Sequence, residues 1–195
     1  MSRDPLDRYY TPPELAEACI RWLRLHGLGD RLYDPCAGGG AWLDAALRVD
    51  PEMQVGGRDI DPEAPAVLDG RAELGSLAEW QPGADPWFVA TNAPYWQVDD
   101  WIRILLDHLR AERIAGVALL MRLTAVEWLM DIDIPPDDLV VSSQRARWGG
   151  PGGAQYASGD SCGVVLAVWR TTTMHWPSAR IWPLGQWRQT GRRTR

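Results

Sequence analysis

The 195-residue sequence contains no lysine, and all 20 of its basic residues are arginine. It also has a single phenylalanine and a single asparagine, Asn92. We interpret this bias as one of codon usage, so it excludes no function by itself. Long apolar runs are absent too: 46% of the residues are hydrophobic, but no stretch is long enough to span a bilayer. The first residues lack the apolar core of a signal peptide, so we expect a cytoplasmic protein without a membrane segment.

Cysteine is also scarce. Cys19, Cys36 and Cys162 are odd in number and lie far apart in the chain. This pattern fits neither a disulfide framework nor a zinc site, and it is typical of a reducing compartment. The three histidines form no pattern of metal ligands, so we expect no metal. At this length the chain is large enough for one domain with a substantial core.

Acidic residues are rare in the last part of the chain. From Ser142 onward eight arginines accompany a single aspartate, whereas up to Val141 there are 12 arginines and 25 acidic residues. The net charge of −6 therefore conceals a basic C-terminal part on an acidic body. Such a distribution predicts a local contact with a polyanion.

Apolar runs of strand length alternate with segments whose apolar residues have helical spacing. This alternation predicts an α/β fold with one doubly wound, mostly parallel sheet of about seven strands. The expected strands are 31–33, 53–59, 71–74, 86–90, 114–121, 138–142 and, antiparallel to the others, 162–169. The expected helices are 12–26, 41–48, 62–68, 98–109 and 125–130. Residues 1–170 are expected to form this domain, followed by a tail, 171–195, rich in tryptophan and arginine.

The first expected helix has the residues of a well-formed N-terminus. Thr11 is expected to be its N-cap, Pro12 its first residue and Glu14 the second member of a capping box. An ordinary capped helix would explain this pattern without any functional role.

A glycine loop, residues 34–40, joins the strand 31–33 to the next helix and reads Asp-Pro-Cys-Ala-Gly-Gly-Gly. A strand, a glycine loop and a helix N-terminus allow backbone to approach a ligand. The loop is neither a full dinucleotide fingerprint nor a phosphate-binding loop with its lysine. Asp34 would repel phosphate and attract a cationic amine. Cys36 has no base beside it, so we expect it to pack and not to act as a nucleophile.

A second acidic residue, Asp59, lies 25 residues after Asp34, at the end of the next strand. Nucleotide-binding α/β units place a ribose-binding carboxylate at about this spacing. For Asp61, which precedes Pro62, a solvated turn is the better interpretation.

The stretch Thr91-Asn92-Ala93-Pro94-Tyr95 directly follows the buried strand 86–90. Ligands bind at this end of the strands in open α/β sheets. Asparagine and proline are also common in ordinary turns, so the stretch alone is compatible with a ligand-binding site and with a simple turn. The glycine loop and the carboxylate upstream favour a binding site.

A glycine-rich loop, residues 144–156, separates the last two expected strands. It carries Arg145, Arg147, Trp148 and Tyr156. A disordered linker is the alternative, but linkers rarely concentrate arginine and tryptophan, so we expect a substrate-binding loop. The arginines and tryptophans of the tail indicate either a phosphate contact or a solvated end.

Three motifs occur together: Tyr-Thr-Pro at 10–12, Asp-Pro-x-x-Gly-x-Gly at 34–40, and Asn-Ala-Pro-Tyr at 92–95. In this order they resemble the motifs of the N6-adenine DNA methyltransferases that use S-adenosylmethionine, and the resemblance covers residues 9–170. The loop and strand after residue 145 also look like those of small phage-borne members. The resemblance implies a Rossmann-like class I methyltransferase fold.

The resemblance also implies the site residues. Those that bind the cofactor would be Tyr10, Thr11, Pro12, Asp34, Pro35, Gly38, Gly40, Asp59 and Ser76. Tyr-Thr-Pro would line the methionine end, Asp34 would hold the amino group, and Asp59 would bind the ribose. Ser76 stands where the family often has an acidic residue for the adenine of the cofactor.

Asn92, Ala93, Pro94 and Tyr95 would carry the chemistry. The exocyclic amine of adenine is a poor nucleophile because its lone pair is delocalised into the ring. The Asn92 side-chain oxygen and the Ala93 carbonyl could accept both of its N–H groups and turn the lone pair toward the methyl group. Pro94 would stiffen the loop and Tyr95 would stack on the flipped base. The family commonly has proline in place of Ala93, but the carbonyl remains.

The function implied is methyl transfer to N6 of a flipped adenine in DNA. Only the glycine-rich loop and the tail are available to read a target, so we expect low sequence specificity. Two alternatives stay open: a non-catalytic nucleic-acid-binding relative, and a methyltransferase that acts on RNA or on a protein glutamine.

Overall fold

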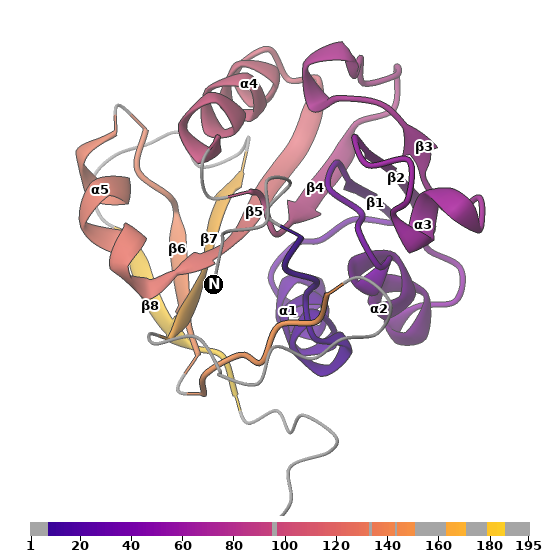
Figure 1. Cartoon of the computed structure of the whole chain (residues 1–195). Helices are drawn as coiled ribbons and strands as arrows, with labels where there is room; N and C mark the ends of the chain where they lie inside the picture. The colour runs from indigo at the N-terminus through magenta and orange to yellow at the C-terminus, as the bar shows by residue number, and fades with distance from the viewer. Residues whose placement is uncertain are drawn as a thin grey trace, which may run out of the picture.

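The computed structural model describes residues 8–94, 97–132, 134–142, 144–150, 163–170 and 179–185. The strands within these ranges form one sheet (Figure 1). In chain order they are β1 (Arg31–Asp34), β2 (Gln54–Asp59), β3 (Glu73–Leu74), β4 (Trp87–Thr91), β5 (Ile114–Arg122), β6 (Asp138–Val141), β7 (Val164–Arg170) and β8 (Arg180–Pro183). The α-helices are α1 (Pro13–Leu25), α2 (Ala41–Val49), α3 (Pro65–Leu68), α4 (Val98–Arg110) and α5 (Val126–Asp131). Two short 3₁₀ helices span Leu77–Glu79 and Leu123–Ala125.

The strand order of the sheet is β3-β2-β1-β4-β5-β7-β6-β8. The first five of these strands pair in parallel. β7 lies between β5 and β6 and runs antiparallel to both, whereas β6 and β8 are parallel. The prediction of a mostly parallel α/β sheet with an antiparallel strand near residues 162–169 is confirmed. The described residues form eight strands where about seven were expected, because β8 was not predicted.

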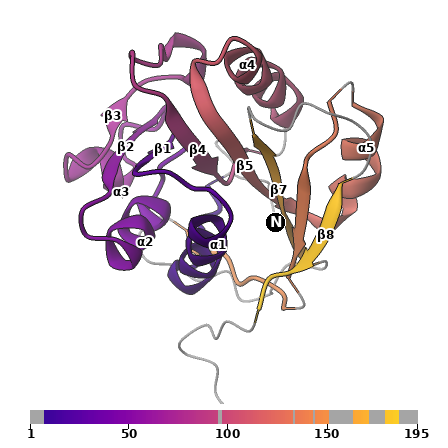
Figure 2. The ribbon, with the colours of Figure 1, turned by 180° about the vertical axis from the view of Figure 1, so that it is seen from behind.

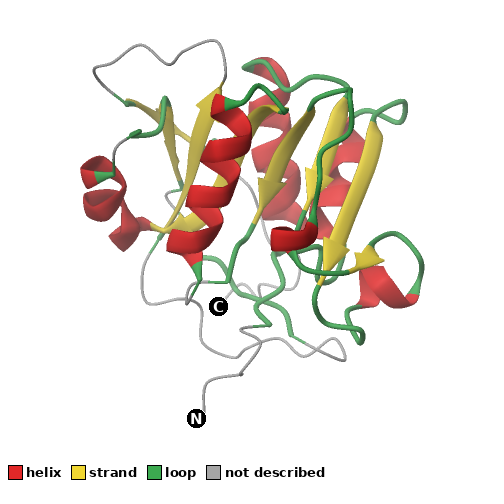
Figure 3. Ribbon diagram, turned by 90° about the horizontal axis from the view of Figure 1, so that it is seen from above, coloured by secondary structure: helices red, strands yellow, loops and turns green. Residues whose placement is uncertain are grey.

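Helices cover both faces of the sheet (Figure 3). α1 and α2 lie side by side on one face (Figure 2), where Leu15, Trp42 and Phe88 are among the buried side chains. α4 packs on the other face, in a core that includes Leu105 and Trp169. The apolar residues of α4 recur at helical spacing, and this turns one side of the helix toward the sheet.

The first helix begins at Pro13, one residue later than expected. Its N-cap residue is Pro12, and no side chain caps the helix N-terminus. The predicted capping box of Thr11 and Glu14 is therefore wrong. Proline suits the first helical position because its missing N–H would have no partner in the helix, while Thr11 is buried in front of the helix.

Strand β8 comes from the segment that we expected to be a tail, and it pairs with β6 beside a buried carboxylate, Asp138. Asp138 accepts hydrogen bonds from the guanidinium groups of Arg170 and Arg180 and from the indole nitrogen of Trp182, the last at 2.8 Å. Burial opposes the ionisation of Asp138, but these donors hold its pKa below the usual range. Residues of three strands thus converge on one carboxylate, and β8 belongs to the sheet.

Replacing Asp138 with asparagine should lower the free energy of unfolding by on the order of 2–3 kcal/mol, because two arginines would face a neutral side chain. Asp107→Asn is a matched control on α4: it removes the exposed partner of Arg110 and should cost less than about 1 kcal/mol. Urea unfolding of the two variants measures the difference. Equal losses would show that Asp138 does not hold β8 in the sheet.

Candidate active site

Loops from four strands meet at the carboxyl edge of the parallel part of the sheet. β1, β2 and β4 end at Asp34, Asp59 and Thr91, and β3 leads into the 3₁₀ helix that Ser76 caps. Because these strands are parallel neighbours, the loops that follow them share one edge. They surround a cavity of about 710 Å³, which is in the range of small-molecule sites.

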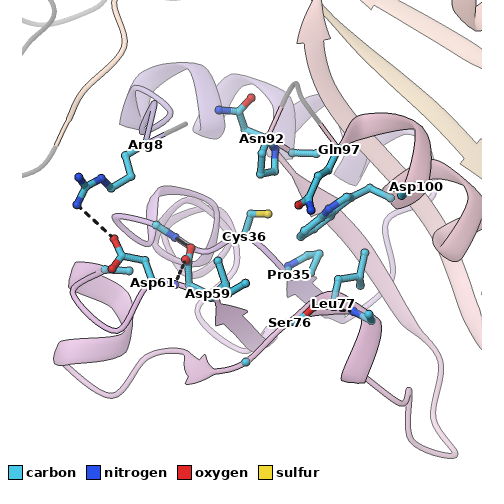
Figure 4. Close-up of a pocket in the computed structure, with 18 of the residues that line it drawn as sticks. Arg8, Pro35, Cys36, Asp59, Asp61, Ser76, Leu77, Asn92, Gln97 and Asp100 are labelled. Atoms are coloured by element: carbon cyan, nitrogen blue, oxygen red, sulfur yellow. Dashed lines mark hydrogen bonds and ion pairs between the residues drawn. The ribbon is translucent and has the colours of Figure 1, made fainter. Parts of the chain in front are cut away.

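The cavity brings together most of the cofactor-binding and catalytic residues predicted from the sequence. Its lining includes Tyr10, Pro35, Gly38, Asp59, Ser76, Asn92, Ala93 and Pro94. In Figure 4, Pro35 and Cys36 lie between Asn92 and Ser76. Four predicted cofactor-binding residues do not line the cavity: Thr11, Pro12, Asp34 and Gly40. The predicted substrate-binding residues Arg145, Arg147 and Trp148 do not line it either. Tyr95 lies outside the described residues.

The glycine loop holds its backbone close to the cavity. Gly38 and Gly40 have left-handed φ angles of 48° and 81°, which residues with a Cβ rarely adopt. The ring of Tyr10 lies against the loop, since a Cβ at Gly38 would stand 3.0 Å from its Cδ1 atom. Arg71 fixes the other end of the loop by donating to the Gly39 carbonyl at 3.3 Å and to an aspartate of α2 at 2.7 Å.

Asp59 forms part of the cavity wall and binds the glycine loop. Its Oδ2 accepts the N–H of Gly38 at 2.7 Å, and its Oδ1 accepts the N–H of Asp61 at 2.9 Å (Figure 4). Burial raises the pKa of Asp59, although these hydrogen bonds act in the opposite direction. A carboxylate oxygen accepts more than one hydrogen bond, so Asp59 can also receive the hydroxyl groups of a ligand.

Asp34 is fully buried beneath the glycine loop. Its Oδ1 accepts the N–H of Cys36 at 3.1 Å, whereas its Oδ2 makes no hydrogen bond of good geometry among the described residues, and the Thr91 hydroxyl beside the carboxyl acts to lower its pKa. Burial raises the pKa of Asp34 to about 7. Leaving a buried acceptor unsatisfied is costly, and a bound cationic group is the kind of partner that such an oxygen would take.

Asn92 is held in a single orientation. Its Nδ2 donates to the backbone carbonyl of Tyr9 at 2.9 Å, and a flipped amide would place two acceptors against each other. Its Oδ1 is buried and has no hydrogen-bond partner within the described ranges. Asn92 lines the cavity, so an acceptor without a partner lies buried in the cavity wall.

Two residues that line the cavity, Arg8 and Asp61, were not predicted from the sequence. Asp61 is only 5% exposed, and its Oδ2 lies 3.7 Å from Nη1 of Arg8 across the cavity edge (Figure 4). The expectation of a solvated turn was therefore wrong. Trp101 and Ile104 of α4 also line the cavity. No signal in the sequence distinguishes residues of this helix that line the cavity from those that only pack against the sheet.

The described part of the glycine-rich loop, residues 144–150, lies beside the segment that precedes α1. Tyr10 and Gly149 exchange two backbone hydrogen bonds of 2.9 Å. Arg145 and Arg147 are exposed, as a contact with a polyanion requires. Trp148 is only 4% exposed and belongs to the core, so it anchors the loop, and its indole is not available for stacking on a base. Tyr156 lies outside the described residues.

Cys36 lines the cavity, and burial raises the pKa of its thiol. This direction disfavours a nucleophilic thiolate. Among the described residues there is no group of three or more side chains that could ligate a metal ion. Over the same part of the chain, no helix has the length and apolar character needed to cross a membrane.

No protein-family model and no curated protein sequence matches this chain. Solved structures are similar to it in fold. A putative RNA methyltransferase from Pyrococcus horikoshii superposes with a TM-score of 0.60 at 16% identity, over 85% of this chain and 87% of that one. The methyltransferase subunit of a type I restriction-modification system from Streptococcus thermophilus gives 0.56 at 14% identity, over 84% of this chain and 45% of that one.

A third similar structure is the plantazolicin methyltransferase BpumL, solved in complex with SAH (S-adenosylhomocysteine). It gives a TM-score of 0.52 at 12% identity, over 81% of this chain and 84% of that one. This chain spans less than half the length of the restriction-modification subunit. The three proteins are methyltransferases of different kinds, and what they share with this chain is the Rossmann-like methyltransferase fold.

Proposed function

We propose that this protein transfers a methyl group from S-adenosylmethionine to the exocyclic N6 amine of adenine in DNA. One observation carries the proposal. Asn92 lines the same cavity as Asp59 and the glycine loop, and its amide oxygen is buried in the cavity wall without a hydrogen-bond partner among the described residues. A cofactor bound by the loop would therefore lie next to an acceptor for an amine.

The residues of the cavity fit S-adenosylmethionine. Asp59 lines the cavity and can accept the ribose hydroxyls. Asp34 does not line it, but it directly precedes the lining residues Pro35 and Cys36, and its buried oxygen could take the amino group. Ser76 is engaged as a helix cap, because its hydroxyl accepts the N–H of Ala78 at 3.1 Å. Contact with the cofactor adenine would then fall to backbone groups near Ser76 and to apolar side chains such as Trp101. The complex of BpumL with SAH supports the same class of cofactor.

When bound, S-adenosylmethionine supplies a methyl group on a positively charged sulfur, which keeps the electron pair of the broken bond. Asn92 and the Ala93 carbonyl would accept the two N–H groups of the target amine and direct its lone pair into the new bond. Positive charge develops on that nitrogen, and fixed acceptors stabilise it without reorganising. The amine then releases one proton to water and becomes neutral again. Pro94 and Tyr95 would border the flipped base.

RNA is the second candidate substrate, because the Pyrococcus horikoshii protein is described as a putative RNA methyltransferase and matches over most of both chains. Exposed Arg145 and Arg147 would meet the phosphates of either nucleic acid. We favour DNA on the motifs at residues 10–12 and 92–95. We further propose low sequence specificity, since no described helix or strand carries a row of arginines for reading a groove.

Methyl transfer can be measured with radiolabelled S-adenosylmethionine offered DNA, RNA and protein in parallel. Label should enter DNA, and Asn92→Ala should reduce the rate by about 100-fold or more, because one fixed acceptor of the transition state is lost. Cofactor affinity should stay the same in this variant. Label in RNA or protein alone would overturn the proposed substrate, and an unchanged rate in Asn92→Ala would overturn the proposed acceptor.

Cofactor binding should depend on pH through Asp34. In the free protein this carboxyl has a pKa raised to about 7 by burial, but the cofactor's ammonium requires the ionised form. Below pH 7 binding must therefore release a proton, and affinity should fall by up to about tenfold per pH unit. Calorimetry with S-adenosylhomocysteine between pH 8 and pH 5.5 measures this. Asp34→Asn should bind weakly with little pH dependence; a wild type without pH dependence would reject the role of Asp34.

Arg145 and Arg147 should contribute to nucleic-acid affinity through phosphate contacts. The double substitution to glutamine should lower the slope of log affinity against log salt by up to about 1.8, since each phosphate contact contributes about 0.9 on duplex DNA. The matched control is Arg21→Gln with Arg110→Gln, two exposed arginines on α1 and α4, which should leave the slope unchanged. Equal slopes in all three proteins would place the DNA contact elsewhere.

A further inference from the structure

The segment Arg8–Pro12, here called the N-terminal strap, touches both sides of the cavity. Arg8, Tyr9 and Tyr10 line it. The strap contacts the glycine loop, the Asn92 loop and residues 144–150, which are far apart in the sequence. It is therefore placed to link the cofactor side of the cavity with the amine side.

The link to the amine side is the hydrogen bond from Asn92 Nδ2 to the Tyr9 carbonyl. This bond decides which end of the amide meets a ligand. With one N–H of the amide engaged by the Tyr9 carbonyl, the amide oxygen is on the opposite side and has no hydrogen-bond partner among the described residues. Without the Tyr9 carbonyl in this place, the amide could turn its nitrogen inward and present two donors to an amine that also donates.

The position of the Tyr9 carbonyl depends in turn on Gly149. The residue after Tyr9 exchanges two backbone hydrogen bonds of 2.9 Å with Gly149. Gly149 directly follows Trp148, which is buried in the core together with Ala146. The strap is thus hydrogen-bonded to a segment whose side chains Ala146 and Trp148 are packed in the core.

On the cofactor side the strap has two contacts. The ring of Tyr10 lies against Gly38 and Gly39 of the glycine loop. Arg8 forms an ion pair with buried Asp61, with 3.7 Å between Nη1 and Oδ2. The strap is held there by the same loops that would bind the cofactor.

We propose that the N-terminal strap is a positioning element for Asn92: the Tyr9 carbonyl, held by the pairing of Tyr10 with Gly149, fixes the amide with its oxygen toward the target amine. The catalytic consequence rests on the proposed function of Asn92, whereas the orientation of the amide does not. In this arrangement Trp148 serves methyl transfer through the strap and not by stacking on a base. Arg8 ties the same element to the cofactor side.

The sequence offers a direct probe, because Asn92 is the only asparagine in the chain. Nitrogen-15 labelling of asparagine side chains therefore gives one carboxamide group in an NMR spectrum of the full chain. In the wild type one of its two Nδ2 protons should be hydrogen-bonded and exchange slowly with water. This readout needs neither cofactor nor turnover.

Gly149→Pro removes the N–H that donates to the Tyr10 carbonyl, and Gly149→Ala is its matched control. An alanine keeps the N–H, and its Cβ would meet the Tyr10 Cβ at an ordinary 3.5 Å. In Gly149→Pro the Asn92 amide should exchange at least about fivefold faster, as expected when a supporting hydrogen bond is lost. The kcat for methyl transfer should fall about tenfold or more through misplacement of the acceptor, while KM for the cofactor stays within about twofold. Gly149→Ala should resemble the wild type in all three measurements.

Arg8→Gln provides a second variant in case Gly149→Pro fails to fold, which thermal unfolding will show. It removes the ion pair to Asp61 and should also speed exchange of the Asn92 amide. An amide with wild-type exchange in either folded variant would overturn the positioning role. If the amide loosens as expected but the wild type transfers no methyl group, the positioning claim stands and the proposed function fails.

Discussion

Parallel pairing of β1 with β2 and β4 is the constraint on which the candidate site depends. In this register Asp34 lies opposite Gly57, and Tyr33 lies opposite Val89. The chain therefore leaves β2 and β4 at the edge where the glycine loop begins, which brings Asp59 and Asn92 to one cavity. Any other pairing of these strands would separate the carboxylates from the amide, whatever the local motifs were.

The features that the sequence predicts well are those decided locally. An apolar run that ends in an aspartate and three glycines is enough to specify β1, the loop and the start of α2, because left-handed backbone at Gly38 and Gly40 favours glycine. Asp59 was singled out from its spacing after Asp34 at the end of a strand, and Asn92 from its place directly after an apolar run. Strand bounds differ from expectation by one or two residues, as in β4 at Trp87–Thr91.

The features that the sequence did not predict depend on partners far along the chain. Burial of Asp61 becomes understandable only when Arg8 lies beside it, and β8 forms beside Asp138, which also binds Arg170. Trp148 lies in a loop whose arginines and aromatic residues are typical of recognition loops, yet its indole packs in the core. In each case the residue type allows two roles, and tertiary packing decides between them. For Trp148 and for strand β8, the content of arginine and tryptophan therefore predicted a contact with another molecule, whereas in the structure these residues make contacts within the protein.

The central claim is that one cavity holds a methyl donor beside an acceptor built for an amino group. The most direct test is to incubate the protein with S-adenosylmethionine and DNA, digest the DNA to nucleosides, and identify the methylated one by mass spectrometry. We expect deoxyadenosine methylated at N6, formed about 100-fold or more slowly by Asn92→Ala. A methyl group on a ring carbon or on a different base, or equal product from Asn92→Ala, would contradict it.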